Sequence, residues 1–331
     1  NPVVRKAQLQ IAMLQYNSGK VAEAAATYKK VAVTYPNTEE AATALSALES
    51  IMVDTNKVDE FNQLAQQLGK SSTTKEDSLQ YKAAEKIYFK NNYAEASVGL
   101  DKYIKMYPQG KYNALAQYYL ANSYYQQKKY NESLALYAKL IENAENPNIE
   151  FSLQRASSIA YDLEKYQDAL GYFTKLDQVG SVESRQPAKL GILRCSYILK
   201  DYNKTIEVST DIINAYSDDE ILTEARYNRY KSYLALSNNA VTELPASALE
   251  DLVALANDTR NIYGAEAKYE LANYYFAKNQ LDKAEAEVFS YISKGTPHQH
   301  YLAKSFVLLS DIYIAKENYF EAKQYLLSLR D

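Results

Sequence analysis

Apolar residues recur along the chain with the spacing of amphipathic helices. Leu120, Ala121 and Tyr124 share one helical face at positions i, i+1 and i+4, and residues 133–140 show a similar stripe. Residues 128–131 between these stretches are too few for anything but an antiparallel helical hairpin. Glycine and proline are sparse, at 9 and 7 of 331 residues, which suits long helices better than a turn-rich β fold.

A five-residue pattern marks the elbow of such hairpins and recurs through the chain. It consists of a flexible polar residue, an aromatic or aliphatic one, two mostly polar ones and a small one. Clear copies end at residues 24, 96, 133, 169, 205, 284 and 322, and a degenerate copy ends at residue 61. The spacings are 37, 35, 37, 36, 36, 79 and 38 residues, and the gap of 79 fits two repeats with one blurred mark. A fixed period of this length predicts about nine stacked helical hairpins.

The repeat resembles the tetratricopeptide repeat family. The fourth unit is close to the family consensus through Leu120, Ala121, Tyr124, Tyr130, Ser133, Tyr137 and Leu140. The resemblance covers nearly the whole chain, and it implies an all-α fold in which about nine hairpins form a right-handed superhelical solenoid. We therefore expect one continuous solenoid over residues 1–331.

The resemblance is weakest in the second and seventh units. In the second unit, Glu49 stands where a small residue is expected, and residues 70–76 after it are interpreted as a longer turn or a soft joint. In the seventh, a long polar connection over residues 237–247 includes Pro245, and Ser247 is expected to cap the next helix.

The resemblance also implies that the first helix of each hairpin lines a concave groove. The expected groove is a ladder of aromatic residues with polar residues between them: Tyr16, Tyr81, Tyr88, Tyr118, Asn122, Tyr125, Tyr161, Arg194, Tyr197, Tyr269, Asn273 and Phe276. Tyrosine suits a partner-binding surface because it buries ring area while its hydroxyl forms hydrogen bonds. The alternative is that these rings pack between adjacent repeats.

The charge pattern narrows the class of partner. The formal net charge is −4, without a basic arm or stripe, so nucleic acid is not expected. No apolar run approaches the ~18 residues that would cross a bilayer. Protein or peptide segments are the partners that the repeat implies.

The residues of common catalytic and metal sites are scarce. Cys195 is the only cysteine and lies within a predicted helix, where a packed side chain is expected. His298 and His300 are the only histidines and lack a third metal ligand nearby, so we expect a surface loop there. No phosphate loop, paired-histidine zinc motif or nucleophile elbow appears. We expect no enzyme activity, cofactor or metal.

These expectations lead to a scaffold or adaptor that binds partner segments. The stretch Tyr107–Tyr112 resembles bacterial envelope members of the family, including outer-membrane-assembly lipoproteins and Tol-Pal coordinators, and the Tyr-rich composition resembles that of Bacteroidota proteins. This implies a periplasmic or outer-membrane-associated protein. The chain opens without Met and stops at Asp331 inside an expected helix, so a leader, a membrane tether or further domains can lie outside it. The alternative is a regulatory or sensory segment of a larger cytoplasmic signalling protein.

Overall fold

Helices are the only regular elements in the part of the chain that the structure describes. The structure is a computed structural model that describes residues 1–143 and 146–329. These residues form eighteen α-helices and one short 3₁₀ helix, η1, without any strand. The predicted all-α fold is confirmed.

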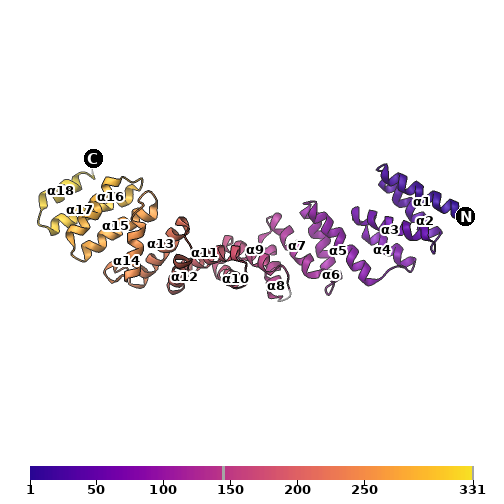
Figure 1. Cartoon of the computed structure of the whole chain (residues 1–331), viewed down its shortest axis with the longest axis horizontal. Helices are drawn as coiled ribbons and strands as arrows, with labels where there is room; N and C mark the ends of the chain where they lie inside the picture. Colours follow the sequence, from indigo (N-terminus) through magenta and orange to yellow (C-terminus); the bar gives the residue numbers. More distant parts are fainter. Residues whose placement is uncertain (144–145, 330–331) are drawn as a thin grey trace. The chain divides into compact units, whose positions relative to one another are not determined.

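The helices group into two compact units, Asn1–Ile159 and Ala160–Asp331. The division falls within α9 (Ile149–Asp162). Unit 1 begins with α1 (Pro2–Asn17), α2 (Val21–Thr34), α3 (Glu39–Asp54), α4 (Val58–Gln67), α5 (Thr73–Phe89), α6 (Tyr93–Met106), α7 (Asn113–Gln126) and α8 (Tyr130–Glu142) (Figure 1). Unit 2 continues with α10 (Tyr166–Val179), α11 (Val182–Ile198), α12 (Tyr202–Ala215), α13 (Asp219–Leu236), η1 (Val241–Glu243), α14 (Ala246–Leu255), α15 (Ile262–Ala277), α16 (Leu281–Lys294), α17 (Gln299–Ala315) and α18 (Tyr319–Leu327).

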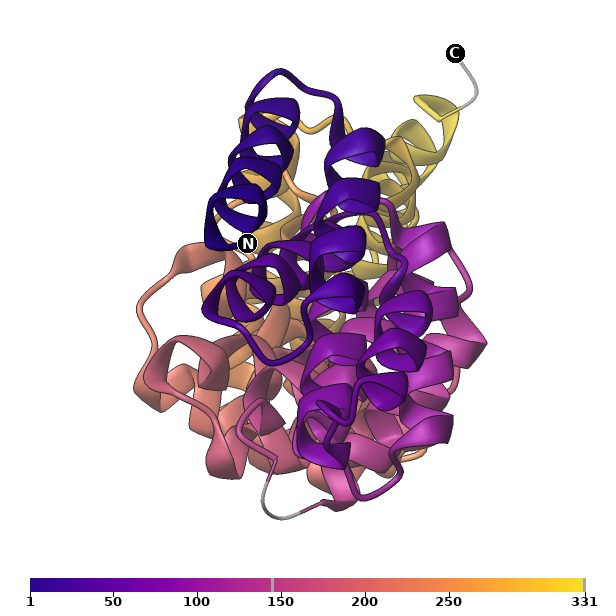
Figure 2. The ribbon, with the colours of Figure 1, turned by 90° about the vertical axis from the view of Figure 1, so that its right-hand side faces the viewer.

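The described helices follow one another as nine pairs, as the period predicts. In unit 1, α1 lies beside α2, α5 beside α6 and α7 beside α8. The second helices α2, α4 and α6 also pack on the first helices that follow them, α3, α5 and α7. Figure 2 shows the N-terminal helices, in indigo, side by side. Unit 2 shows the same order, with α15 against α16 and α17 against α18. The handedness of the stack and its continuity over residues 1–331 stay predictions.

Each elbow contains a residue in the left-handed backbone region. At Lys128 φ is +61°, and the next N–H, that of Lys129, donates to the carbonyl of Tyr124 at 2.9 Å. This is the Schellman arrangement that satisfies the last carbonyls of a helix. The left-handed elbow residues are Gly19, Asn56, Asn91, Lys128, Glu164, Lys200, Asn238 with Asn239, Asn279 and Glu317. Asn238 and Asn239 thus mark the seventh elbow, which the five-residue pattern leaves blurred.

Small residues lie where the two helices of a hairpin cross. Ala12 and Ala24 of the first hairpin are fully buried. In the fourth, the Ser133 hydroxyl donates to the carbonyl of Ala121 at 2.8 Å, which joins α8 to α7. The ring of Tyr137 is fully buried as well. Small side chains let the backbones approach closely, and large rings fill the remaining space.

The second hairpin lacks this close crossing. Phe61 stands where the other clear repeats have Ala, Ser or Thr, and Glu49 stands where they have Ala or Ser except at Leu193 of the sixth. The carboxylate of Glu49 pairs with the Lys75 ammonium at 2.7 Å, and the ring of Phe61 is buried between the helices. Helix α4 has only 10 residues, against 14 in α2, and it packs on α3 less extensively than α2 packs on α1.

The predicted soft joint is shorter than the sequence suggests. The hydroxyl of Ser72 accepts a hydrogen bond from the Lys75 N–H at 3.3 Å, and α5 begins at Thr73. Residues 73–76 therefore form the first turn of α5, and the connection covers residues 68–72. Its softness stays a prediction.

The long seventh connection contains a turn of 3₁₀ helix. Helix α14 begins at Ala246, and Pro245 precedes it with a φ of −69°. Ser247 lies inside the first helical turn, so the prediction that it caps α14 is wrong. Proline at this boundary starts the helix because its fixed φ suits it and it has no N–H to satisfy.

The elbow geometry predicts a gain in stability from glycine at Lys128. A side chain with a Cβ is strained in the left-handed region, and glycine is not, so Lys128→Gly should raise the free energy of unfolding by about 0.5–1 kcal/mol. The measurement is the urea midpoint of unfolding. Lys129→Gly is the matched control, because Lys129 has a φ of −86° and glycine there relieves no strain. Equal effects of the two substitutions would contradict the argument.

Candidate partner-binding surface

All twelve predicted groove residues lie on first helices. They fall on α1 (Tyr16), α5 (Tyr81, Tyr88), α7 (Tyr118, Asn122, Tyr125), α9 (Tyr161), α11 (Arg194, Tyr197) and α15 (Tyr269, Asn273, Phe276). Half of them precede a left-handed elbow residue by three positions. The repeat therefore places equivalent side chains at equivalent points of successive first helices, but their surroundings differ.

Tyr88 and Asn122 join two adjacent repeats in unit 1. The Tyr88 ring stacks on that of Tyr119 with centroids 4.5 Å apart, and its hydroxyl accepts a hydrogen bond from the Asn122 amide. Burial raises the pKa of Tyr88. These contacts link α5 to α7, so packing between repeats, the alternative considered for the ladder, applies at this position.

Tyr81 has almost no accessible surface. Its exposed fraction is 3%, and its ring stacks on Tyr112 with centroids 4.4 Å apart. Its hydroxyl donates to Glu85 at 2.6 Å, and burial followed by this hydrogen bond raises its pKa. The ring of Tyr81 thus belongs to the interior of unit 1, and only its neighbours on the face have ring area to offer a partner.

Tyr16, Tyr118 and Tyr125 keep accessible ring area. Tyr16 is 41% exposed, and Tyr118 and Tyr125 are half-buried. The Arg155 guanidinium lies 4.8 Å from the centre of the Tyr125 ring, a distance typical of cation–π contacts. Exposed aromatic edges beside a fixed positive charge make this part of the face suited to peptide contacts.

In unit 2, Arg194 is already engaged by a carboxylate. Its guanidinium donates two hydrogen bonds to Glu224, at 2.6 and 2.7 Å, which joins α11 to α13. Tyr161 and Tyr197 stay half-buried, and each meets the tyrosine of its own elbow edge to face, Tyr166 and Tyr202. The Arg194 side chain is 47% exposed, so a partner can still reach it.

The three predicted residues of α15 share one hollow. Tyr269, Asn273 and Phe276 line a depression of about 380 Å³ between α15 and α17. Lys304 and Asp311 of α17 complete its polar lining, and the Lys304 ammonium lies 4.7 Å from the centre of the Tyr269 ring. This hollow combines an apolar floor with charges of both signs, which fits a peptide segment better than a purely hydrophobic ligand.

A carboxylate that the sequence analysis missed organises the neighbouring part of the face. Glu266 accepts hydrogen bonds from the hydroxyls of Tyr227 and Tyr301, at 2.8 and 2.9 Å, and from the Lys231 ammonium at 2.9 Å. It thereby joins α13, α15 and α17. Tyr227, Glu266 and Tyr301 are spaced by 39 and 35 residues, close to the repeat period, and this spacing was the signal available in the sequence.

Glu266 and Glu270, one helical turn apart, have opposite electrostatic surroundings. Burial opposes the charge of Glu266, but the hydrogen bonds from Lys231, Tyr227 and Tyr301 hold its pKa below the usual value. Burial raises the pKa of Glu270, and the weak hydrogen bond from Asn273 at 3.3 Å offsets it only in part. Glu270 is therefore an under-paired carboxylate on the first-helix face.

The cysteine is packed in the interior, and the two histidines lie at the start of α17. Cys195 is fully buried, and burial raises its pKa to about 11, which disfavours a reactive thiolate. His298 precedes α17 and its ring bonds to the carbonyl of Arg260 at 3.0 Å, whereas His300 lies in the first turn of α17. Within residues 1–143 and 146–329, no three His, Cys, Asp or Glu side chains gather as a metal site would require. The helices described there include none that is long and apolar enough to cross a bilayer.

A family model for the tetratricopeptide repeat matches residues 6–38 and 115–146. These two segments are tetratricopeptide repeats. The first matched segment covers α1 with α2 and the second covers α7 with α8, which are two of the hairpins that carry the predicted pattern. Tetratricopeptide repeats are in general protein-interaction scaffolds and not enzymes, and they bind protein or peptide partners.

Solved structures of tetratricopeptide repeat proteins are similar to this chain at low identity. YrrB, described as having an unusual peptide-binding site, is 18% identical with a TM-score of 0.42, over 57% of this chain and 90% of that one. A protein from Parabacteroides merdae is 16% identical with a TM-score of 0.31, over 91% and 98%. PilF of Pseudomonas aeruginosa is 17% identical with a TM-score of 0.34, over 66% and 95%. None of the curated proteins matches the chain.

The contrast between Glu266 and Glu270 predicts opposite effects of glutamine. Glu266→Gln should lower the free energy of unfolding by roughly 2 kcal/mol at pH 7, because three donors lose a charged acceptor. This loss should shrink as the pH falls through the lowered pKa of Glu266. Glu270→Gln should raise stability at pH 7, because ionisation of a carboxyl with a raised pKa opposes folding, and this gain should vanish below the usual Glu pKa.

The measurement for this pair is the urea midpoint of each variant and of the parent chain between about pH 3 and pH 8. The two variants serve as controls for each other, since they change the same side chain on the same helix. Effects of the same sign at pH 7 would contradict the assignment of the two environments.

Proposed function

We propose that the chain is an interaction scaffold whose first-helix face binds extended or helical segments of partner proteins in bacterial envelope assembly. The observation that carries this proposal is the hollow between α15 and α17, where three predicted groove residues line one depression. Tyr269 and Phe276 offer ring surface there, and Asn273 offers an amide. Aromatic side chains supply large contact area at a small entropic cost, which is why they dominate many binding surfaces.

The charges around the hollow define the preferred segment. Lys304 and Asp311 lie on its α17 side, and the under-paired Glu270 directly follows Tyr269 in α15. A segment with an apolar anchor flanked by a basic residue would place its positive charge near Glu270 and Asp311. The Lys304 ammonium lies over the Tyr269 ring, where it can pair with one acidic residue of the bound segment.

The envelope location rests on the resemblance of Tyr107–Tyr112 to envelope members of the family. In the structure this stretch forms a tight turn, with the Gly110 N–H donating to the Tyr107 carbonyl at 2.9 Å. A side chain on Gly110 would meet the Tyr103 hydroxyl at 2.7 Å, so the glycine is required by packing. The motif therefore has a structural reason in any compartment, and its support for an envelope location comes from the resemblance alone.

Photo-cross-linking from the first-helix face tests the function. Benzoylphenylalanine replaces Phe276 on α15 or Tyr125 on α7, in cells of the native organism. We expect both positions to capture a protein of the cell envelope. The matched controls are Phe289 on α16 and Ala135 on α8, which are exposed positions on the second helices of the same hairpins. Capture from the controls alone would contradict binding by the first-helix face, and capture of cytoplasmic signalling proteins alone would contradict the envelope role.

A substitution in the hollow then measures how much the hollow contributes to the affinity for the partner segment. With the captured partner segment, Phe276→Ala should weaken binding about tenfold or more, because a buried aromatic anchor contributes upwards of ~1.4 kcal/mol. Isothermal titration gives the affinities. Phe289→Ala on α16 is the control and should leave the affinity unchanged.

A further inference from the structure

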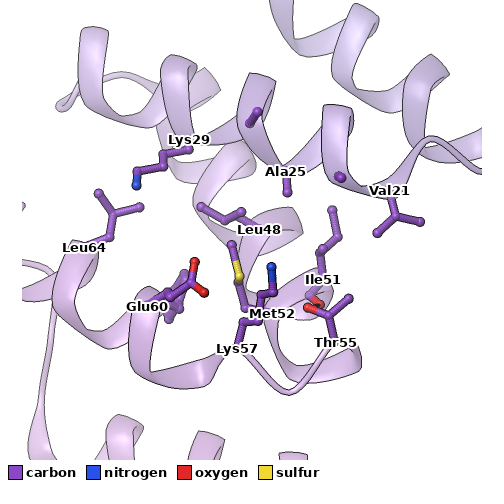
Figure 3. A pocket seen from close by; sticks show the side chains of 13 residues that line it. Val21, Ala25, Lys29, Leu48, Ile51, Met52, Thr55, Lys57, Glu60 and Leu64 are labelled. Carbon is purple, nitrogen blue, oxygen red and sulfur yellow. Dashed lines mark hydrogen bonds between the residues drawn. The ribbon is translucent and has the colours of Figure 1, made fainter.

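A second concave site lies on the opposite side of the first hairpins of unit 1. It is a half-open apolar pocket of about 390 Å³, walled by the second helices α2 and α4 and floored by α3. Figure 3 shows Val21, Ala25 and Lys29 along the α2 wall and Leu48 and Met52 reaching in from α3. None of the predicted groove residues lines it, so it is separate from the first-helix face.

The pocket lies at the degenerate second repeat. In the first hairpin, the helices cross closely because Ala12 and Ala24 are small and fully buried. In the second, Glu49 and Phe61 occupy the same places, so α4 cannot settle on α3 in the same way. The short α4 stands off, and the side of α3 that bears Leu48 is left between two separated walls.

The shape of the pocket matches a helix laid between two helices. The α2 wall runs from Val21 to Lys29 and the α4 wall from Lys57 to Leu64, each about two turns or roughly 10–12 Å long. The α2 wall presents Ala22, Ala25 and Ala26, which allow the backbone of an inserted helix to come near. Apolar side chains of such a helix, one turn apart, would reach Leu48 and its neighbours on the floor.

The charges at the mouth of the pocket favour an inserted helix that carries acidic residues. Lys29 and Lys57 line the pocket, and no ion pair joins either lysine to another residue within the ranges that the structure describes. Glu60 is the one carboxylate among the lining residues, so the mouth carries a net positive charge. Lys75, which lies 5.8 Å from the Phe61 ring, is already paired with Glu49 and does not alter this balance.

We propose that this pocket docks an amphipathic helix of a partner protein, with two apolar side chains one turn apart and acidic residues flanking them. The apolar pair fills the space over α3, and the acidic flanks meet Lys29 and Lys57. This site goes beyond the proposed function of the first-helix face and does not rest on it, because no residue is shared between the two surfaces.

Three labelled synthetic helices, each about 16 residues long, test the proposal on the full chain. The first carries leucines at i and i+4 with glutamate flanks, the second has the same leucines with lysine flanks, and the third is a scrambled form of the first. Fluorescence anisotropy gives the affinities. We expect the glutamate peptide to bind about three- to tenfold more tightly than the lysine peptide, and the scrambled peptide not to bind.

Charge variants test whether the two lysines at the mouth of the pocket set the preference for acidic peptides. The double variant Lys29→Glu/Lys57→Glu should reverse the preference between the two charged peptides. Lys30→Glu is the matched control, because Lys30 is exposed on the same helix but does not line the pocket. An equal effect of Lys30→Glu would overturn the proposal, since it would show a general charge effect of the surface.

A bulky side chain on the α2 wall should block the site. Ala25→Phe should weaken both charged peptides at least about tenfold while leaving the helical content of the chain unchanged by circular dichroism. Ala22→Phe, at an exposed position of the same wall, serves the same purpose if Ala25→Phe lowers the helical content. Unchanged peptide binding in a folded wall variant would overturn the proposal. Dodecanoate is tested in parallel, and saturable dodecanoate binding without binding of either charged peptide would assign the pocket to small amphiphiles and overturn it as well.

Discussion

The close crossing of two helices at small residues is the constraint on which the rest of the structure depends. Ala12 against Ala24, or Ala121 against Ser133, lets the backbones of one hairpin approach, and the left-handed elbow turns the chain back at the right point. Where the small pair is present, the apolar stripe of both helices is covered by the neighbouring hairpin. In the second hairpin, where Glu49 and Phe61 replace this pair, α4 packs less extensively on α3 and an apolar pocket is present. The close packing of the regular hairpins and the open packing of the second one are thus both related to which residues stand at the helix crossing.

The nine helix pairs could be predicted because this rule is local in sequence. Small residues, elbow aromatics and amphipathic stripes recur at one period whatever the rest of the chain does. The seventh mark was missed because its small residue is replaced. The remaining signal was the pair Asn238 and Asn239, since asparagine is one of the residues that adopt the left-handed position at the end of a helix. Ser247 was misplaced for a related reason, since Pro245 starts α14 without a side-chain cap.

Whether a groove tyrosine packs between repeats or stays accessible to a partner could not be predicted from the sequence of its own repeat. Tyr88 and Tyr125 occupy the same position, and each meets the tyrosine of its own elbow, but a further contact comes from the next hairpin and differs between them. For Tyr88 it is Tyr119, which stacks on it, and for Tyr125 it is Arg155, which lies against it as a cation. The first contact uses the ring to hold two repeats together, and the second leaves an edge accessible. A sequence pattern identifies equivalent positions, whereas binding surface depends on neighbours one period away.

The same reasoning explains why the least regular hairpin is the one with a pocket on its second-helix side. A regular repeat buries its apolar stripe completely, so every departure from the pattern leaves surface without a partner or requires a substitute contact. The ion pair between Lys75 and Glu49 is such a substitute contact, because the Lys75 ammonium neutralises the carboxylate that stands in place of a small residue. The floor residues Leu48 and Ile51 are themselves buried in the core of unit 1, and the space above them between α2 and α4 stays open. An array built from identical rules therefore gains a distinct surface at the point where one small residue becomes large.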